Sequence, residues 1–187
     1  MIKYEKVNAD FDLTGKAAIV VGGAGGIGEA TARMYAMKGA KVAIVDCKDT
    51  CPEVAEAIAK DYGVETIGIK CDVTDQASVD DMMKAVVDAF GEVNILAAMP
   101  GFVDLYRAEE IAISTIEKHL AINAVGVFRV CQAVANQMIK QRNGGKIVFI
   151  TSQADFIAIN KHVGYTMSKA AVVGMLKVCA LEWAEYG

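Results

Sequence analysis

Glycine dominates the segment Val21-Gly22-Gly23-Ala24-Gly25-Gly26-Ile27-Gly28-Glu29-Ala30, which joins an apolar run to a helical pattern. Glycine permits positive φ and lets the backbone approach a phosphate closely. The start of the following helix supplies free N–H groups and the positive end of a dipole, which favour a pyrophosphate. A plain tight turn needs only one or two glycines. We therefore expect a nucleotide-binding turn between a strand and a helix.

Two glycine spacings fit this segment. Gly23, Gly25 and Gly28 match the dinucleotide fingerprint G-x-G-x-x-G. Gly22, Gly26 and Gly28 match a wider form, G-x-x-x-G-x-G. The residues of the turn leave the choice open.

Short apolar runs alternate with helical patterns along the chain. The expected strands are Ala17–Val21, Val42–Val45, Thr66–Ile69, Val93–Ala98 and Lys146–Thr151. The expected helices are Ile27–Lys38, Pro52–Lys60, Ser78–Phe90, Ser114–Gln141 and Val163–Tyr186. Continuous β-branched and apolar strands are typical of strands buried on both faces. Strands that alternate with helices in this way predict an α/β fold, a Rossmann-like, doubly wound parallel sheet in three α/β/α layers.

Size and composition agree with one such domain. The 187 residues are 54% hydrophobic and 22% charged, which predicts a single globular domain over residues 1–187. The net charge of -4 argues against a nucleic-acid partner. No apolar run approaches the roughly 18 residues of a membrane span, and Met1 to Asp10 lacks a signal-peptide core. We expect a cytoplasmic protein without a membrane partner.

Cysteine and histidine spacing predicts no metal site. Cys47 and Cys51 are four residues apart, but no nearby histidine or second cysteine pair completes a zinc set. His119 and His162 are far apart in the sequence. We expect the five cysteines to be reduced and to behave as small apolar residues.

Asp46 closes the second expected strand, 18 residues after Gly28. A carboxylate there can accept both ribose hydroxyls of adenosine and repel a 2′-phosphate, which favours NAD over NADP. Lys48 is close enough to soften that preference. An ordinary solvated aspartate at a strand end is the alternative.

Asp72 follows the third expected strand in Cys71-Asp72-Val73-Thr74-Asp75. At the carboxyl edge of the sheet its carboxylate could accept a hydrogen bond from an adenine amino group. Asp75 fits the N-cap of the next helix. A capping role is also open for Asp72.

Tyr165 and Lys169 are four residues apart, so on a helix they share one face. A nearby cation favours the phenolate and lowers the tyrosine pKa. A base at neutral pH needs a fall of about 3 units from about 10, or roughly 4 kcal/mol. One lysine would rarely supply that, but a bound cationic cofactor ring could add to it. A pair without function is the alternative.

Together these features resemble the short-chain dehydrogenase/reductase family over the whole chain. The match is carried by Gly22-x-x-x-Gly26-Ile27-Gly28, Asp46, Asp72-Val73, Asn123 in Ile122–Phe128, Ser152 in Ile147–Ser152, and Tyr165-x-x-x-Lys169. The resemblance favours the wider glycine spacing, and the separation of 13 between Ser152 and Tyr165 is usual for the family.

The resemblance implies roles for four residues. Tyr165 would be the catalytic acid/base, and Lys169 would lower its pKa and hold the nicotinamide ribose. Ser152 would orient or polarise the substrate oxygen, and Asn123 would hold a water in a proton path to Lys169. Hydride transfer belongs to the cofactor. The implied cofactor-binding residues are Gly22, Gly25, Gly26, Ile27, Gly28, Asp46, Asp72, Val73, Ala98, Tyr165 and Lys169.

A narrower similarity points to members that oxidise small sugar alcohols such as threitol, galactitol or glycerol-like diols. It is carried by Ser152-Gln153-Ala154, Lys161-His162-Val163-Gly164-Tyr165 and Ala180-Leu181-Glu182-Trp183-Ala184. Gln153, Asn160 and His162 could bind extra hydroxyls. A solvated loop position is the alternative for His162.

Three departures from the family pattern stand out. Val21 replaces the family's Thr before the glycine turn, and Ala98-Met99-Pro100-Gly101 replaces Asn-Asn-Ala-Gly. Pro100 also removes an N–H donor, so cofactor affinity or turn rigidity is in doubt. The family has about 250 residues, the size of one α/β domain. We therefore expect that C-terminal strands are lacking here.

Two other functions remain open at this stage. One is an NADP-dependent 3-oxoacyl or other ketoreductase, and the other is a non-catalytic nucleotide-binding subunit. The resemblance also implies a homotetramer or homodimer packed through Ser114–Gln141 and the final helix. The apolar contacts expected there are Val172, Val173, Leu176 and Trp183. The same residues could face the sheet instead.

Overall fold

The computed structural model describes residues 11–187 and confirms the alternation of strands and helices. The strands are β1 (Ala17–Val21), β2 (Lys41–Asp46), β3 (Thr66–Lys70), β4 (Ile95–Ala98) and β5 (Lys146–Phe149). The helices are α1 (Gly26–Met37), α2 (Cys51–Tyr62), α3 (Gln76–Phe90), α4 (Ile113–Leu120), α5 (Val127–Gln141) and α6 (Val163–Trp183). Shorter pieces are the π-helix Ala121–Gly126 and the 3₁₀ turns Gln153–Asp155 and Ala184–Tyr186.

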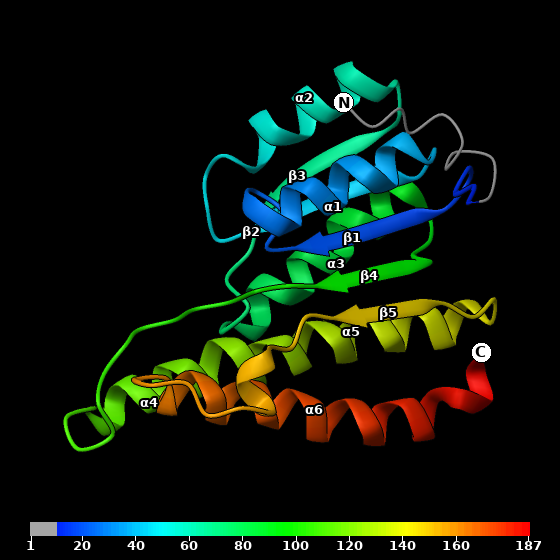
Figure 1. Cartoon of the computed structure of the whole chain (residues 1–187). Coiled ribbons are helices and arrows are strands. Elements are labelled where there is room, and N and C mark those ends of the chain that lie inside the picture. The colour runs from blue at the N-terminus through cyan, green and yellow to red at the C-terminus, as the bar shows by residue number, and fades with distance from the viewer. Residues whose placement is uncertain (1–10) are drawn as a thin grey trace.

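The five strands form one parallel sheet in the order β3-β2-β1-β4-β5 (Figure 1). The chain winds outward in one direction from β1 to β3 and then crosses back to β4. Val21 is in register with Val45 of β2 and Ala98 of β4. The carboxyl ends of these three strands therefore meet at the topological switch point, where open α/β sheets bind ligands.

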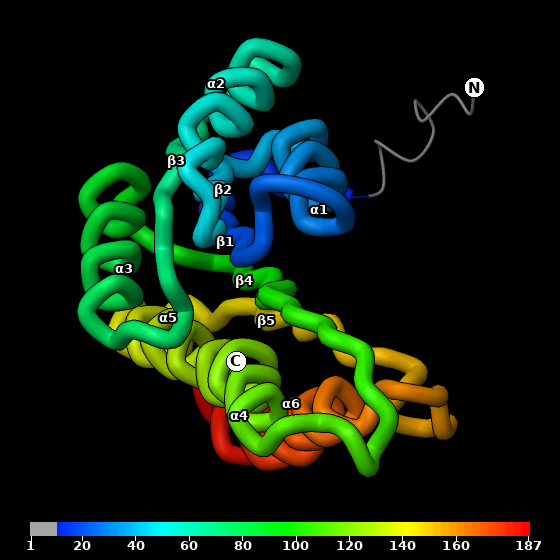
Figure 2. Tube along the Cα trace, turned by 90° about the vertical axis from the view of Figure 1, so that its left-hand side faces the viewer, coloured from blue at the N-terminus to red at the C-terminus, as the bar shows by residue number. Residues whose placement is uncertain are grey.

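Helices cover both faces of the sheet and confirm the three predicted layers. Helices α1 and α2 lie on one face, and α3, α5 and α6 lie on the other (Figure 2). The alternating pleat divides each strand between two cores. On β1, Val20 packs in the core with α1 and α2, whereas Ile19 packs in the core with α3 and α5.

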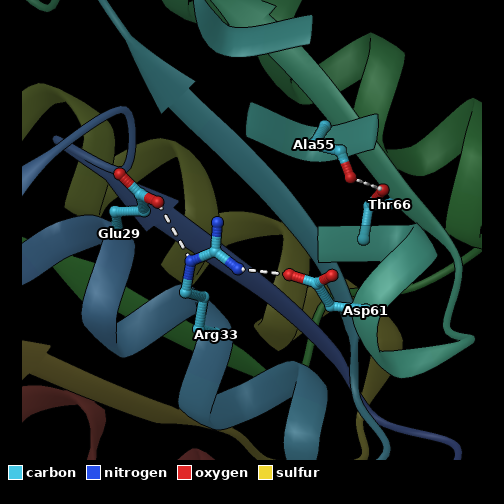
Figure 3. A network of polar contacts seen from close by, with 5 residues as sticks. All are labelled: Glu29, Arg33, Ala55, Asp61 and Thr66. Carbon is cyan, nitrogen blue, oxygen red and sulfur yellow. Dashed lines mark hydrogen bonds and ion pairs between the residues drawn. The ribbon is translucent and has the colours of Figure 1, made fainter. Parts of the chain in front are cut away.

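Polar contacts join the outer elements on the α1 and α2 face (Figure 3). Arg33 of α1 is 2.9 Å from Glu29 on its own helix and 2.8 Å from Asp61 on α2. The Thr66 hydroxyl at the start of β3 donates to the Ala55 carbonyl of α2 at 2.7 Å. These contacts fix α2 against both α1 and β3.

The expected helix Ser114–Gln141 is helical throughout but is not uniform, because its middle is the π-helix Ala121–Gly126. A π turn admits one extra residue per turn and is frequent at functional sites. Gly126 lies so close to Val73 that an added Cβ would be 2.7 Å from Val73 Cγ2. The absence of a side chain at Gly126 therefore lets this helix approach the segment after β3.

Strand β5 departs from the expectation that every strand is buried on both faces. It pairs with β4 and, within residues 11–187, forms the edge of the sheet. Val148 is 46% exposed, and Ile150, just after the strand, is 39% exposed. None of the described helices is long and apolar enough to cross a membrane.

Candidate active site

A cavity of about 540 Å³ lies at the carboxyl ends of β1, β2 and β4 and continues past the end of β3. This is the switch point of the sheet. Five predicted cofactor residues line it, namely Gly22, Gly25, Asp46, Asp72 and Val73. Met99–Phe102 form another part of its wall, which includes most of the segment that departs from the family pattern.

The glycine turn has space for a backbone only. Gly22 has φ +81°, and an added Cβ would lie 2.8 Å from the Met99 carbonyl oxygen. Gly28 in α1 contacts the Gly22 carbonyl so closely that no Cβ fits. The turn thus places the N-terminus of α1, with its N–H groups that lack helical acceptors, beside the cavity. This cradle fits the pyrophosphate of a dinucleotide.

The other predicted cofactor residues lie around the turn. Gly26 and Ile27 begin α1, and the Ile27 side chain is 68% exposed. Ala98 is buried at the end of β4, in register with Val21.

Asp46 is held against the glycine turn. Its Oδ2 accepts a hydrogen bond from the Ala24 N–H at 3.2 Å. Lys48 reaches the same residue, with Nζ 3.4 Å from the Ala24 carbonyl oxygen. The cavity therefore has a carboxylate and an ammonium group in one corner.

Cys47 lies beside Asp46 and differs from the other four cysteines. It is exposed, whereas Cys51, Cys71, Cys131 and Cys179 are buried, and all five are free thiols. Partial burial, followed by the hydrogen bond to Asp46, raises the pKa of the Cys47 thiol. Only the four buried cysteines behave as the small apolar residues that the sequence predicts.

Asp72 forms a local turn with Thr74. Its Oδ1 accepts from the Thr74 N–H at 2.8 Å and from the Thr74 hydroxyl at 2.7 Å. These hydrogen bonds lower the pKa of Asp72. The cap of α3 is Asp75, which accepts from the Ala77 N–H at 3.2 Å, as predicted. The capping alternative for Asp72 is therefore wrong.

Tyr165 and Lys169 lie in the first two turns of α6 and share one face. Lys169 Nζ is 5.7 Å from the centre of the Tyr165 ring and donates to the Ile150 carbonyl at 2.9 Å. Lys169 is only 3% exposed, and burial lowers its pKa. Lys169 is thus buried, while Tyr165 beside it is partly exposed.

Ser152 lies in the connection from β5 to α6. Its Oγ accepts from the Ala154 N–H at 3.1 Å and begins the 3₁₀ turn Gln153–Asp155, which packs against α6. Helix packing thus brings the Ser152 connection to the helix of Tyr165. Gln153 itself is exposed.

Asn123 is fully buried in the π-helix and binds both backbone groups of Phe102. Its Oδ1 accepts from the Phe102 N–H at 2.7 Å, and its Nδ2 donates to the Phe102 carbonyl at 2.7 Å. Nδ2 also donates to Ser168 Oγ at 3.0 Å, and that hydroxyl donates to the Tyr165 carbonyl at 2.7 Å. The Asn123 side chain therefore links α6 to the cavity wall.

His162 lies next to Tyr165 but faces a different cavity. The two rings are 6.0 Å apart in an edge-on arrangement, and His162 Nδ1 is 2.7 Å from the Asn160 carbonyl oxygen. His162 and Asn160 line a cavity of about 390 Å³ that also includes Tyr106. The structure therefore separates His162, Asn160 and the exposed Gln153 from the wall of the dinucleotide cavity.

His119 and Phe102 are absent from the residues selected from the sequence. His119 is fully buried and binds the backbone of Asp104, while Phe102 lines the dinucleotide cavity. His119 lies four residues before Asn123 on a helical segment, and that spacing is the signal that could have identified it. Within residues 11–187, no cluster of His, Cys, Asp and Glu could hold a metal ion.

Comparisons with known proteins agree with this geometry. The sequence profile described as short chain dehydrogenase matches residues 16–187. D-threitol dehydrogenase of Mycolicibacterium smegmatis is 43% identical, over 100% of this chain and 72% of the relative. NAD-dependent glycerol dehydrogenase of Listeria innocua is 36% identical, over 98% of this chain and 70% of the relative.

A solved structure gives the same result. The crystal structure of an NAD⁺-bound xylitol dehydrogenase has a TM-score of 0.89 and 32% identity, over 94% of this chain and 67% of the other. Members of this family bind a nicotinamide cofactor and act as oxidoreductases on alcohols. The glycine cradle, the parallel sheet and the profile match lead to one conclusion: the chain belongs to the short chain dehydrogenase family.

Proposed function

We propose that the chain is an NAD-dependent dehydrogenase that interconverts a small polyol or similar secondary alcohol with its ketone. One observation carries the proposal. A chain of hydrogen bonds from Tyr165 through Ser168 and Asn123 to Phe102 joins the Tyr165/Lys169 helix to the wall of a cavity with a dinucleotide cradle. The threitol, glycerol and xylitol dehydrogenases named above support the polyol class.

Residues in and around the cavity would bind the different parts of the cofactor. The glycine turn and the N-terminus of α1 would bind the pyrophosphate, Asp46 the adenosine ribose, and Asp72 and Val73 the adenine. Ala98 would lie beneath the cofactor, and Lys169 would hold the nicotinamide ribose. When bound, the nicotinamide supplies the hydride acceptor for alcohol oxidation.

The chain's own residues would handle the proton. Tyr165 as phenolate takes the hydroxyl proton of the alcohol as the carbonyl forms, and returns it in the reverse direction. Lys169 favours the phenolate by its positive charge. Ser152 donates a hydrogen bond to the substrate oxygen, and Asn123 positions the helix and a water of the proton path.

The preference for NAD rests on Asp46. Its carboxylate would accept the ribose hydroxyls and repel a 2′-phosphate. Lys48, which reaches the same corner, is the one feature that favours the NADP-dependent ketoreductase alternative. Thermal-shift titrations with both cofactors separate the two functions. We expect the larger stabilisation with NAD, and a larger shift with NADP would favour the ketoreductase.

The reaction is tested by Tyr165→Phe. The variant loses the acid/base oxygen, so we expect at least a 100-fold loss of polyol oxidation, the lower end of general acid–base effects. NAD binding should persist, because the cradle is unchanged. Activity of the variant equal to wild type would overturn the proposed role. Wild-type protein that binds NAD but oxidises none of a panel of polyols and secondary alcohols would favour the non-catalytic alternative.

A further inference from the structure

The segment after β4 forms one wall of the dinucleotide cavity but lacks the anchors that its sequence could have supplied. Ala98 has no side-chain amide, and Pro100 has no N–H. Residues beyond Pro100 are instead held from outside the segment. The Phe102 backbone binds Asn123, the Asp104 N–H binds His119, and the Tyr106 N–H binds the Lys161 carbonyl.

His119 makes two hydrogen bonds that fix its protonation state. Its Nδ1 is 2.8 Å from the Thr115 carbonyl oxygen, which can only accept, so Nδ1 carries the proton. Its Nε2 is 3.1 Å from the Asp104 N–H, which can only donate, so Nε2 must be an unprotonated acceptor. The buried ring is therefore a neutral imidazole in one defined tautomer.

His119 also contacts both sides of the site. Its ring packs on Phe102 at 4.8 Å between centroids, and Phe102 lines the cavity. On the other side, His119 is tightly packed against Gly164 of α6, where an added Cβ would be 3.0 Å from Nδ1. Gly164 immediately precedes Tyr165. The imidazole thus lies between the cavity wall and the start of the Tyr165 helix.

We propose that His119 is a positioning residue for the dehydrogenase reaction, which holds the cavity wall in its cofactor-binding position through the Asp104 N–H and the Phe102 ring. The inference rests on the proposed function, because it takes the cavity to be the NAD site. His119 touches neither cofactor nor substrate in this account. It replaces, from α4, the anchors that Ala98 and Pro100 cannot supply.

The positioning depends on Nε2 as an acceptor. A side chain that accepts a hydrogen bond at the same place would keep the Asp104 N–H paired, whereas a side chain too short to reach it would leave that N–H without a partner.

Two substitutions separate the two hydrogen bonds. In His119→Gln, the amide oxygen can take the place of Nε2 and accept from the Asp104 N–H. In His119→Asn, the shorter amide can still donate to the Thr115 carbonyl but cannot reach Asp104. The probe is NAD itself, with binding to wild type and both variants measured by calorimetry at one pH.

We expect the Asn variant to bind NAD about tenfold more weakly than wild type, because the partly buried Asp104 N–H is left without a partner. The Gln variant keeps the acceptor but loses the ring contact with Phe102, so its affinity should lie between those of wild type and the Asn variant. Gln and Asn variants that weaken binding equally, or an Asn variant that binds NAD as tightly as wild type, would overturn the role of His119. Wild-type protein that binds no NAD would instead contradict the proposed function.

Discussion

Lys169 is a lysine whose side chain is almost completely buried. Its 3% exposure is unusual for a lysine, and its hydrogen bond is to a neutral carbonyl, that of Ile150. Burial lowers the pKa of Lys169 below its unfolded value of about 10.4. Between the two pKa values the unfolded chain binds more protons than the folded chain, so stability rises with pH in that window. Below the folded-state pKa the cost of the buried charge is fully present.

Lys169→Met should therefore change stability in a pH-dependent way. Methionine has no charge to bury. The free energy of unfolding of the variant relative to wild type should therefore be greatest at neutral pH, and this difference should shrink as the pH approaches about 10. We expect the difference between the two pH values to be about 1 kcal/mol, the order of an imperfectly compensated polar burial. Urea unfolding at neutral and alkaline pH measures it.

The matched control is Lys177→Met on the exposed side of α6. Its stability relative to wild type should show no comparable dependence on pH. A Lys169→Met difference that is constant from neutral to alkaline pH would contradict the account of the buried charge.

Sequence spacing could identify some site residues and not others for a physical reason. Tyr165 and Lys169 lie within one helix, so the period of the helix alone places them together. Asn123 and His119 instead bind backbone groups of Phe102 and Asp104, which every residue type offers. A side chain that binds backbone imposes no residue type on its partner, so the sequence does not show which segment these two side chains contact.

At the scale of elements, the start of α2 packs very closely against β3. An added Cβ on Gly68, in the middle of β3, would overlap the carbonyl of Cys51 and the nitrogen of Pro52. These are backbone atoms at the start of α2 and cannot rotate away. Gly68→Ala should therefore lower the free energy of unfolding by about 2–3 kcal/mol, as overpacking does. Chemical denaturation measures the loss.

Gly174→Ala is the control for that substitution. Gly174 lies within α6, and an added Cβ would have no heavy atom within 4 Å. Because glycine in a helix is less favourable than alanine by roughly 1 kcal/mol, this variant should be slightly more stable than wild type. Equal stability of the Gly68→Ala variant and wild type would show that α2 can move away from β3 at little cost.

Element boundaries were predictable where chemistry marks them. Asp75 caps α3, and Gly91 follows Phe90 at its end in a left-handed conformation. The π-helix Ala121–Gly126 carries no such mark, because it is continuous with the helices on both sides and has no side-chain cap. Strand β4 begins at Ile95, two residues later than expected, and the preceding Asn94 binds the Ala17 N–H at 2.8 Å through its side chain.

At the scale of the whole molecule, the alternation of strands and helices predicted a parallel, doubly wound sheet. The exposure of β5 could not be predicted in the same way, because it depends on which elements cover that edge of the sheet. The predicted oligomer contacts show the same limit. Val172 is 1% exposed and faces inward, whereas Trp183 packs against the core and also lines a cavity between α5 and α6. The apolar residues of α6 do not by themselves show which of them meet the sheet.

A different set of residues forms the outer face of these helices. Val125 and Phe128, at the end of the π-helix and the start of α5, are 52% and 37% exposed. Val178 and Leu181 of α6 are 53% and 80% exposed. Phe128 and Val178 line one cavity of about 330 Å³ between α5 and α6, which places the two pairs on a common surface. Trp183 of the predicted set lines the same cavity, and we expect this surface to pack against a second copy of the chain.

Light scattering tests that surface directly. Wild-type chain should have a mass that is a multiple of 19.9 kDa, and Phe128→Glu combined with Val178→Glu should lower it, because each introduced carboxylate would be desolvated at the contact. The control Val103→Glu changes an equally exposed apolar side chain, 54% exposed, in the segment after β4 and should leave the mass unchanged. A wild-type mass of one chain would remove the proposed contact. An oligomer that persists in the double variant would place it on another face.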